Sequence, residues 1–139
     1  MIIYIFVFVG LAFSSCDSVD LRLTISNKEP NTVSYFLSDS DIDNAASLYS
    51  TLFLYNSRGE KKFREFKFIK GKAAVHISTL GNWENVLNAK SDSGEMQLYI
   101  IDSVDLGKDK TTLIKNKLIR KYIINLKNLK SNNWVVTIQ

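Results

Sequence analysis

The chain has 139 residues, of which 45% are hydrophobic and 12% aromatic, and its formal net charge is +4. This hydrophobic content excludes an intrinsically disordered chain and is sufficient for one globular domain with a single core. The single cysteine excludes a disulfide framework, and the sequence contains no internal repeat.

The chain begins with an uncharged apolar run that ends in Ser14, Ser15 and Cys16. Its apolar stretch of about twelve residues is shorter than the roughly 20 that span a bilayer, but it suits the h-region of a signal peptide. Small residues before a lone cysteine resemble a bacterial lipoprotein signal, in which the cysteine carries fatty acyl chains such as palmitate. We therefore expect a signal peptide over residues 1–15, lipidation at Cys16 and a tether over residues 16–20. The alternative is a buried first strand with an ordinary free cysteine.

Hydrophobic alternation predicts a first strand over residues 21–27, with Leu21, Leu23 and Ile25 facing inward. A turn follows and leads to a second strand over residues 32–37. Because the two strands are consecutive and the connection is short, we expect them to form a hairpin.

An acidic loop follows and contains Asp39, Asp41 and Asp43. Carboxylates at alternate positions can converge on one calcium ion, as at the start of the EF-hand loop. The match then fails, because Asn44 stands where that loop needs glycine and Ser50 stands where it needs a bidentate glutamate. We therefore expect an acidic surface loop and no metal or other cofactor, with the three aspartates as weak candidates for a metal site.

The rest of the chain is predicted to form short strands, with small helices only in the connections. Strands are expected over residues 48–55, 63–69, 73–78, 95–102, 118–126 and 134–138, and helical turns over residues 81–90, 109–117 and 128–132. Asn82 can cap the first of these helices, in which Trp83, Val86 and Leu87 lie at helical spacing. Seven or eight short strands at roughly 10-residue intervals predict an all-β fold with minor helical turns, specifically an immunoglobulin-like antiparallel β-sandwich over residues 21–139.

Candidate catalytic residues are scarce. His76 is the only histidine, and the Ser, Asp and Glu residues form neither a nucleophile elbow nor a spaced catalytic pair. We therefore expect no enzymatic activity. Some aromatic residues could face outward and stack against sugars, although packing within the sheets is their more frequent use; the candidates are Tyr35, Phe36, Tyr49, Tyr55 and Tyr99.

Basic residues are frequent over residues 58–72 and 108–130. They alternate with apolar residues on predicted strands, as on a solvated sheet face, so we expect no nucleic-acid partner. The same charge would suit an acidic protein partner.

Several segments resemble, in the same order, small lipoproteins of Bacteroidetes type. The matching segments are Thr24–Asn27, Ser34–Phe36, Trp83–Glu84, Leu98–Asp102, Leu118–Tyr122, Leu126–Leu129 and Asn133–Ile138. The resemblance implies a β-sandwich that is attached by lipid to the cell envelope. The outer membrane is favoured, and both its periplasmic and its external face stay open. No activity is implied, because none is established for that family.

Two functions stay open for the domain. The first is a binding or accessory module of the envelope, with an envelope protein or a glycan as its partner. The second is an inhibitor or immunity-type lipoprotein that neutralises a secreted effector. Attachment to the membrane through a lipid anchor is expected under both.

Overall fold

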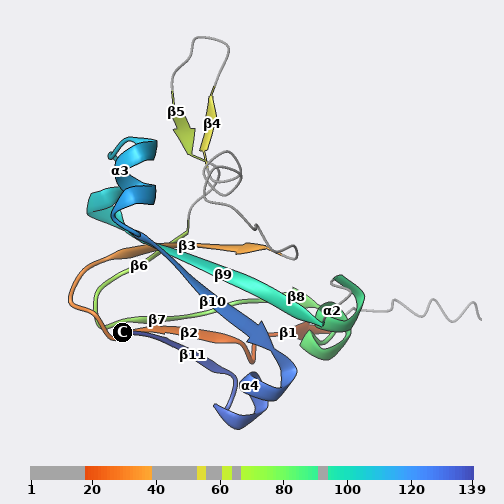
Figure 1. The fold of residues 1–139 in the computed structure, drawn as a ribbon. Coiled ribbons are helices and arrows are strands. Elements are labelled where there is room, and N and C mark those ends of the chain that lie inside the picture. The colour runs from red at the N-terminus through yellow and green to blue at the C-terminus, as the bar shows by residue number, and fades with distance from the viewer. Residues whose placement is uncertain (1–17, 39–52, 56–60, 64–66, 91–93) are drawn as a thin grey trace, which may run out of the picture.

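The computed structural model describes residues 18–38, 53–55, 61–63, 67–90 and 94–139. Two sheets lie face to face (Figure 1), and the described part of the chain is all-β with a few short helices. The first sheet has four antiparallel strands in the order β10 (Ile119–Asn125), β9 (Glu95–Asp102), β3 (Val33–Ser38) and β6 (Lys67–Ile69). The second sheet has three strands in the order β11 (Val135–Ile138), β2 (Thr24–Asn27) and β7 (Ala74–His76). Strand β11 runs parallel to β2, so the expectation of purely antiparallel sheets is wrong for this sheet.

Smaller elements complete the fold. Strand β1 (Val19–Asp20) pairs with β8 (Thr79–Leu80), and β4 (Phe53–Tyr55) pairs with β5 (Lys61–Phe63). The helices are α2 (Trp83–Lys90), the 3₁₀ turn η1 (Ser103–Asp105), α3 (Lys110–Lys115) and α4 (Leu126–Ser131). Within the described ranges, no helix has the length and apolar character needed to cross a bilayer.

The main core fills the space between the two sheets. Both sheets contribute residues to this core, including Val33 and Leu98 from the first sheet and Ile25 and Ile138 from the second. Strand β9 lies inside the sheet, between β10 and β3, and its residues from Met96 to Ile101 are buried because both of its faces are covered. Ile100 of β9 belongs to the main core. Tyr99 and Ile101, on the opposite face of β9, pack in a second cluster with Leu106 and Leu113.

Helix α2 confirms the prediction made from its sequence. The Asn82 side-chain oxygen accepts a hydrogen bond from the Asn85 amide at 2.8 Å, which satisfies one of the free N–H groups of the first turn. Trp83 and Leu87 are buried against the core, and Val86 packs beside them. The apolar face thus follows the 3.6-residue period of the helix.

The predicted hairpin between the first two strands is wrong. Strand β2 pairs antiparallel with β7 and parallel with β11, whereas β3 lies in the other sheet between β6 and β9. The buried Asn27 side chain holds the connection in place by donating to the Asn31 carbonyl at 2.8 Å. Alternation in a sequence shows which face of a strand is buried, but it does not show which strand is the neighbour.

The prediction that Leu21 faces inward is also wrong. Asp20 is the register partner of Thr79, and the Leu23 carbonyl accepts from the Ile77 amide at 2.8 Å. Two residues, Leu21 and Arg22, therefore oppose the single residue between those partners, which is a β-bulge. The bulge turns Leu21 outward, where it is 54% exposed.

Candidate binding groove

A groove of about 390 Å³ lies between the outer strand of each main sheet, β10 and β11, and the helix α4 that connects them. Its apolar lining comes from the two strands and from one leucine of the helix, namely Tyr122, Ile123, Ile124, Leu129, Val135 and Val136. Its polar lining comprises Asn128, Asn132 and Thr137. Ligand sites commonly combine an apolar lining with a few polar groups in this way.

Each strand beside the groove has only one strand neighbour in the described sheets. Strand β10 pairs with β9, and β11 pairs with β2. An outer strand presents backbone N–H and C=O groups that another extended segment can use. The groove therefore lies between two sheet edges that are open to such pairing.

Helix α4 lies at one end of the groove, and its sequence determines where the helix begins and which of its sides is apolar. The Asn125 side chain caps its first turn by accepting from the Asn128 amide at 2.9 Å. Leu129 is buried in the core, while Asn128 and Asn132 line the groove.

The turn from α4 into β11 has an unusual backbone. Asn133 and Trp134 have φ angles of 51° and 64°, in the left-handed region that a bulky residue rarely adopts. The Trp134 amide donates to the Leu129 carbonyl at 2.7 Å, and its carbonyl accepts from the Thr24 amide at 2.9 Å. These two hydrogen bonds hold the turn, so that Val135 lines the groove while the Trp134 ring packs against the core.

The Trp134 ring also contacts a charged cluster of Arg22, Asp20 and Glu84, which we call the Arg22 cluster. The Arg22 guanidinium lies 4.0 Å from the ring centroid, a favourable cation–π arrangement. The same guanidinium bridges Asp20 at 2.6 Å and Glu84 at 2.5 Å. The Asp20 Oδ2 atom, which binds Arg22, also accepts a hydrogen bond from the Trp83 amide at 3.1 Å. Strand β1, helix α2 and the start of β11 are thereby joined at one point.

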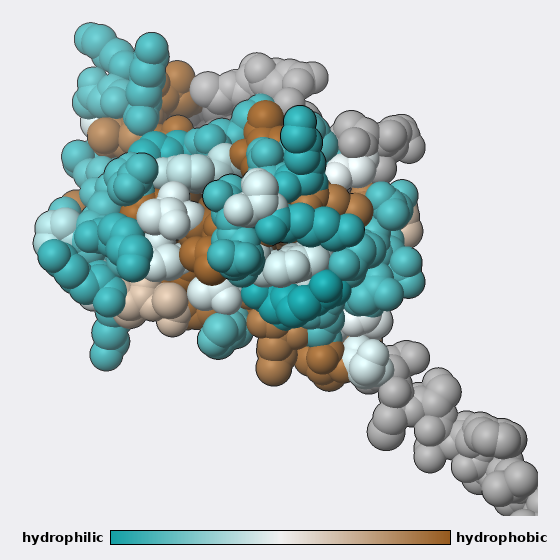
Figure 2. Space-filling view, turned by 90° about the horizontal axis from the view of Figure 1, so that it is seen from below, coloured by the Kyte–Doolittle hydropathy of each residue, from teal (hydrophilic) through white to brown (hydrophobic). Residues whose placement is uncertain are grey.

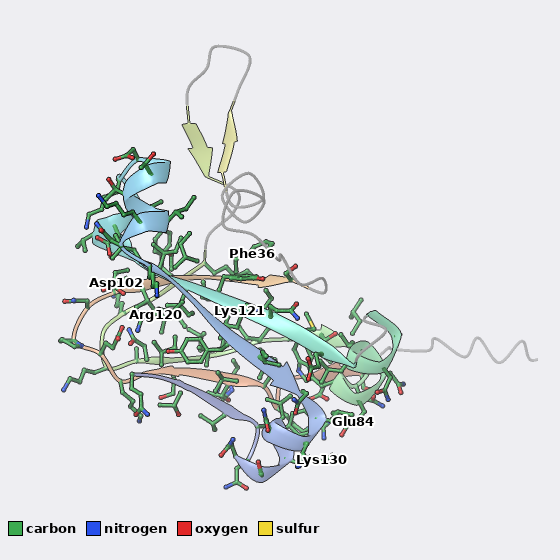
Figure 3. The ribbon with its side chains drawn as sticks, viewed as in Figure 1. Phe36, Glu84, Asp102, Arg120, Lys121 and Lys130 are labelled. Atoms are coloured by element: carbon green, nitrogen blue, oxygen red, sulfur yellow. The ribbon has the colours of Figure 1, made fainter. Side chains whose placement is uncertain are left out.

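Electrostatics within this cluster favour the charged forms of all its groups. Hydrogen bonds from Arg22 hold the pKa of Asp20 and the pKa of Glu84 below their usual ranges. The two carboxylates in turn raise the pKa of Arg22. Lys130 of α4 adds a smaller attraction that also lowers the pKa of Glu84, and Figure 3 shows both side chains at this end of the molecule.

A second ion cluster lies at the end of β9 and the start of β10. Arg120 binds both oxygens of Glu29, at 2.5 and 2.8 Å, and one oxygen of Asp102 at 2.8 Å. Figure 3 shows Arg120 beside Asp102. The hydrogen bonds from Arg120 lower the pKa of Glu29. This cluster links the connection after β2 to the first sheet, and its groups are all engaged with one another.

Several residues singled out from the sequence lie outside the described ranges. These are the predicted lipidation site Cys16 and the weak metal candidates Asp39, Asp41 and Asp43. Among the residues that the structure does describe, no group of three or more His, Cys, Asp or Glu side chains could hold a metal ion.

The remaining candidates have structural positions. His76 is exposed on β7, where its Nδ1 lies 3.0 Å from the Thr24 hydroxyl. Tyr35 and Tyr99 are buried, which confirms sheet packing and removes them from any sugar-stacking surface; Phe36 is half-buried. Tyr49 lies outside the described residues, and the structure does not describe the Tyr55 side chain.

Comparison with protein-family models, with curated proteins and with solved structures finds no match for this chain. The resemblance to small lipoproteins therefore stays a prediction. Sequence reasoning missed both the groove and the Arg22 cluster. Arg22 and Glu84 are 62 positions apart, and no local pattern indicates that they meet. The groove is lined by residues 122–137, where two strands and a helical turn were predicted, but the sequence does not show that the two strands join different sheets.

Proposed function

We propose that this chain is a lipid-anchored binding module of the bacterial cell envelope that accepts an extended, acidic stretch of a partner protein in the groove. The observation that carries the proposal is the groove itself, which lies between two open sheet edges. Recognition by strand addition uses such an edge for backbone hydrogen bonds and adjacent pockets for alternate side chains.

Charge supports an acidic partner. Residues 121–139, which supply most of β10 and all of α4 and β11, contain no Asp or Glu; their basic residues are Lys121, Lys127 and Lys130. Charges within about 10 Å of a site still act on it at moderate salt, so lysines on the elements that form the groove favour an acidic ligand.

The immunoglobulin-like β-sandwich is part of the proposal. Two facing sheets of four and three strands that share one apolar layer support it. The connections from β2 to β3, from β6 to β7 and from β10 to β11 each pass from one sheet to the other, as in many sandwich domains.

The sequence around Cys16 supports the anchor. Cys16 follows two serines at the end of the apolar run, and acyl chains on its sulfur would hold the domain at an envelope membrane, with the outer membrane favoured. Mass spectrometry of the protein purified from membranes should find residue 16 as an acylated N-terminus. A Cys16→Ser variant should appear in the soluble fraction, and its retention in the membrane fraction would contradict the proposed anchor.

The groove is tested with a blocking substitution and a matched control. Ile123 lines the groove and is 49% exposed, so Ile123→Glu should place a repelling carboxylate in it without a large effect on the core. Phe68 is 55% exposed on β6, at the other edge of the same sheet, so Phe68→Glu introduces the same charge away from the groove.

The ligand for this test is a ten-residue peptide of alternating glutamate and valine, compared with a lysine–valine peptide of equal length. We expect the acidic peptide to bind the unaltered protein and the Phe68→Glu variant, but to bind Ile123→Glu several-fold more weakly. The affinity should fall as salt is raised. Equal binding of both peptides, or equal binding by both variants, would contradict the proposed function. A secreted effector found crosslinked at the groove would favour the inhibitor or immunity-type role.

A further inference from the structure

We infer that the β1–β8 edge is a membrane-contact surface, which lies against the same lipid bilayer that carries the anchor. This inference rests on the proposed acylation of Cys16, and it adds a defined orientation of the domain at the membrane.

Exposed hydrophobic side chains gather at this edge. Val19 is 56% exposed, Leu21 54% and Leu80 71%. They are three of the six large hydrophobic residues that are exposed in the described parts of the chain. Val19 and Leu80 are direct cross-strand partners, and the bulge turns Leu21 outward beside them. In the view from below (Figure 2), hydrophobic side chains project from the rim of the molecule near the N-terminal end of the described chain.

The distance from the anchor to this edge is short. The Ser18 carbonyl accepts a hydrogen bond from the Gly81 amide at 3.0 Å, so the chain is already attached to the domain at Ser18. Only Asp17 separates Ser18 from Cys16. Two residue steps span at most about 7 Å, which places the start of β1 within that distance of an acylated cysteine.

The Arg22 cluster makes the attachment of β1 rigid. Asp20 accepts from the Arg22 guanidinium and from the Trp83 amide, which ties the strand to α2 two residues after Ser18. The edge therefore cannot move away from the bilayer independently of the domain. The Arg22 charge also compensates the Asp20 and Glu84 carboxylates, which reduces the cost of bringing them near the headgroups.

Aliphatic side chains held at the membrane interface enter the boundary between headgroups and acyl chains, because burial there removes apolar surface from water. The acyl chains supply the affinity, and the three side chains supply the orientation. An alternative occupant is a second protein, and the experiment below distinguishes it from lipid.

The test uses the lipidated full chain in vesicles of phosphatidylethanolamine and phosphatidylglycerol. Cys16 is the only cysteine, and acylation consumes its thiol, so a single introduced cysteine can be spin-labelled selectively. Leu80→Cys places the label at the proposed contact. Lys28→Cys is the control, because Lys28 is exposed and follows Val19 by nine positions, or roughly 30 Å along an extended strand.

We expect the Leu80→Cys label to be several-fold more accessible to oxygen, which partitions into lipid, than to a water-soluble nickel chelate. The Lys28→Cys label should show the reverse. Adding Val19→Ser and Leu21→Ser to Leu80→Cys should reduce the preference for oxygen while acylation is retained.

The outcomes separate the inference from the proposed function. If mass spectrometry shows acylated Cys16 but both labels face water equally, the membrane-contact surface is refuted and the anchor stands. A label at Leu80 that is shielded from both reagents would indicate a protein occupant and would also refute it. If Cys16 is not acylated, the anchor itself is refuted and the inference falls with it.

Discussion

The Arg22 guanidinium lies 4.0 Å above the Trp134 ring and at the same time bridges Asp20 and Glu84. A guanidinium is suited to this role because its planar face can stack on a ring while its edge binds carboxylates in a fixed geometry. The contact connects the first strand of the chain to the beginning of the last one. Together with the pairing of β1 with β8, it secures β1 to the rest of the domain.

We therefore expect Arg22→Ala to loosen β1 without unfolding the main core. The amide of Gly81, which is bonded to Ser18, should exchange its hydrogen faster, while amides of β9 keep their protection. Arg22→Lys should be intermediate, because an ammonium group cannot bind both carboxylates with the same geometry. Hydrogen exchange followed by NMR measures both sites in one experiment, and Lys28→Ala is the matched control. Uniform loss of protection in β9 would contradict a local role.

Gly71→Ala should be strongly destabilising, because a Cβ at this position would lie 1.8 Å from the Pro30 carbonyl oxygen. Backbone must then move, which costs about 2 kcal/mol or more of the free energy of unfolding. Gly107→Ala is the control, since a Cβ there meets no atom within 4 Å. Urea denaturation of both variants measures the difference, and similar midpoints for the two would contradict the close approach at Gly71.

Asn27→Ala should destabilise the fold by about 2–4 kcal/mol. The Asn27 side chain is fully buried, donates to the carbonyls of Asn31 and Lys70, and accepts from the Glu29 amide at 3.0 Å. Its removal leaves these partly buried backbone groups without their partner. Asn31→Ala provides the control, because the bond at Asn31 uses its main chain and its side chain is exposed. A loss equal to that of Asn31→Ala, measured by urea denaturation, would contradict this role.

Stability should decrease in acid. The pKa values of Asp20, Glu29 and Glu84 are lowered in the folded protein by hydrogen bonds from arginines, so the folded state binds fewer protons than the unfolded chain. The stabilisation is therefore complete above the carboxyl pKa values of the unfolded chain, about 3.9–4.3, and is lost as pH falls through the lower folded values.

Glu29→Gln removes one of these carboxylates and should flatten the pH dependence below about pH 5. It should also lower stability at neutral pH, because Arg120 loses its bidentate partner. Urea midpoints measured between pH 7 and pH 3 check both effects. An unchanged acid slope in Glu29→Gln would show that other groups cause the loss.

The sequence alone determined the local elements of this protein. Alternation and continuous hydrophobic runs located β3 and β9, and Asn82 with its apolar positions located α2, because these signals depend on neighbours within a few residues. The all-β class followed from the number and spacing of such segments. The expected lipid anchor also depends only on a short local motif around Cys16.

The tertiary structure decided which strands are neighbours and which side chains meet. Hydrophobic alternation is nearly the same whether β2 pairs with β3 or with β7 and β11, so the choice depends on packing of the whole core. The bulge that exposes Leu21 and the stacking of Arg22 on Trp134 join segments far apart in the chain. The groove is lined by residues 122–137 alone, and it depends on β10 and β11 joining different sheets. Contacts of this kind form only when two sheets close over one apolar layer, and no stretch of sequence encodes them separately.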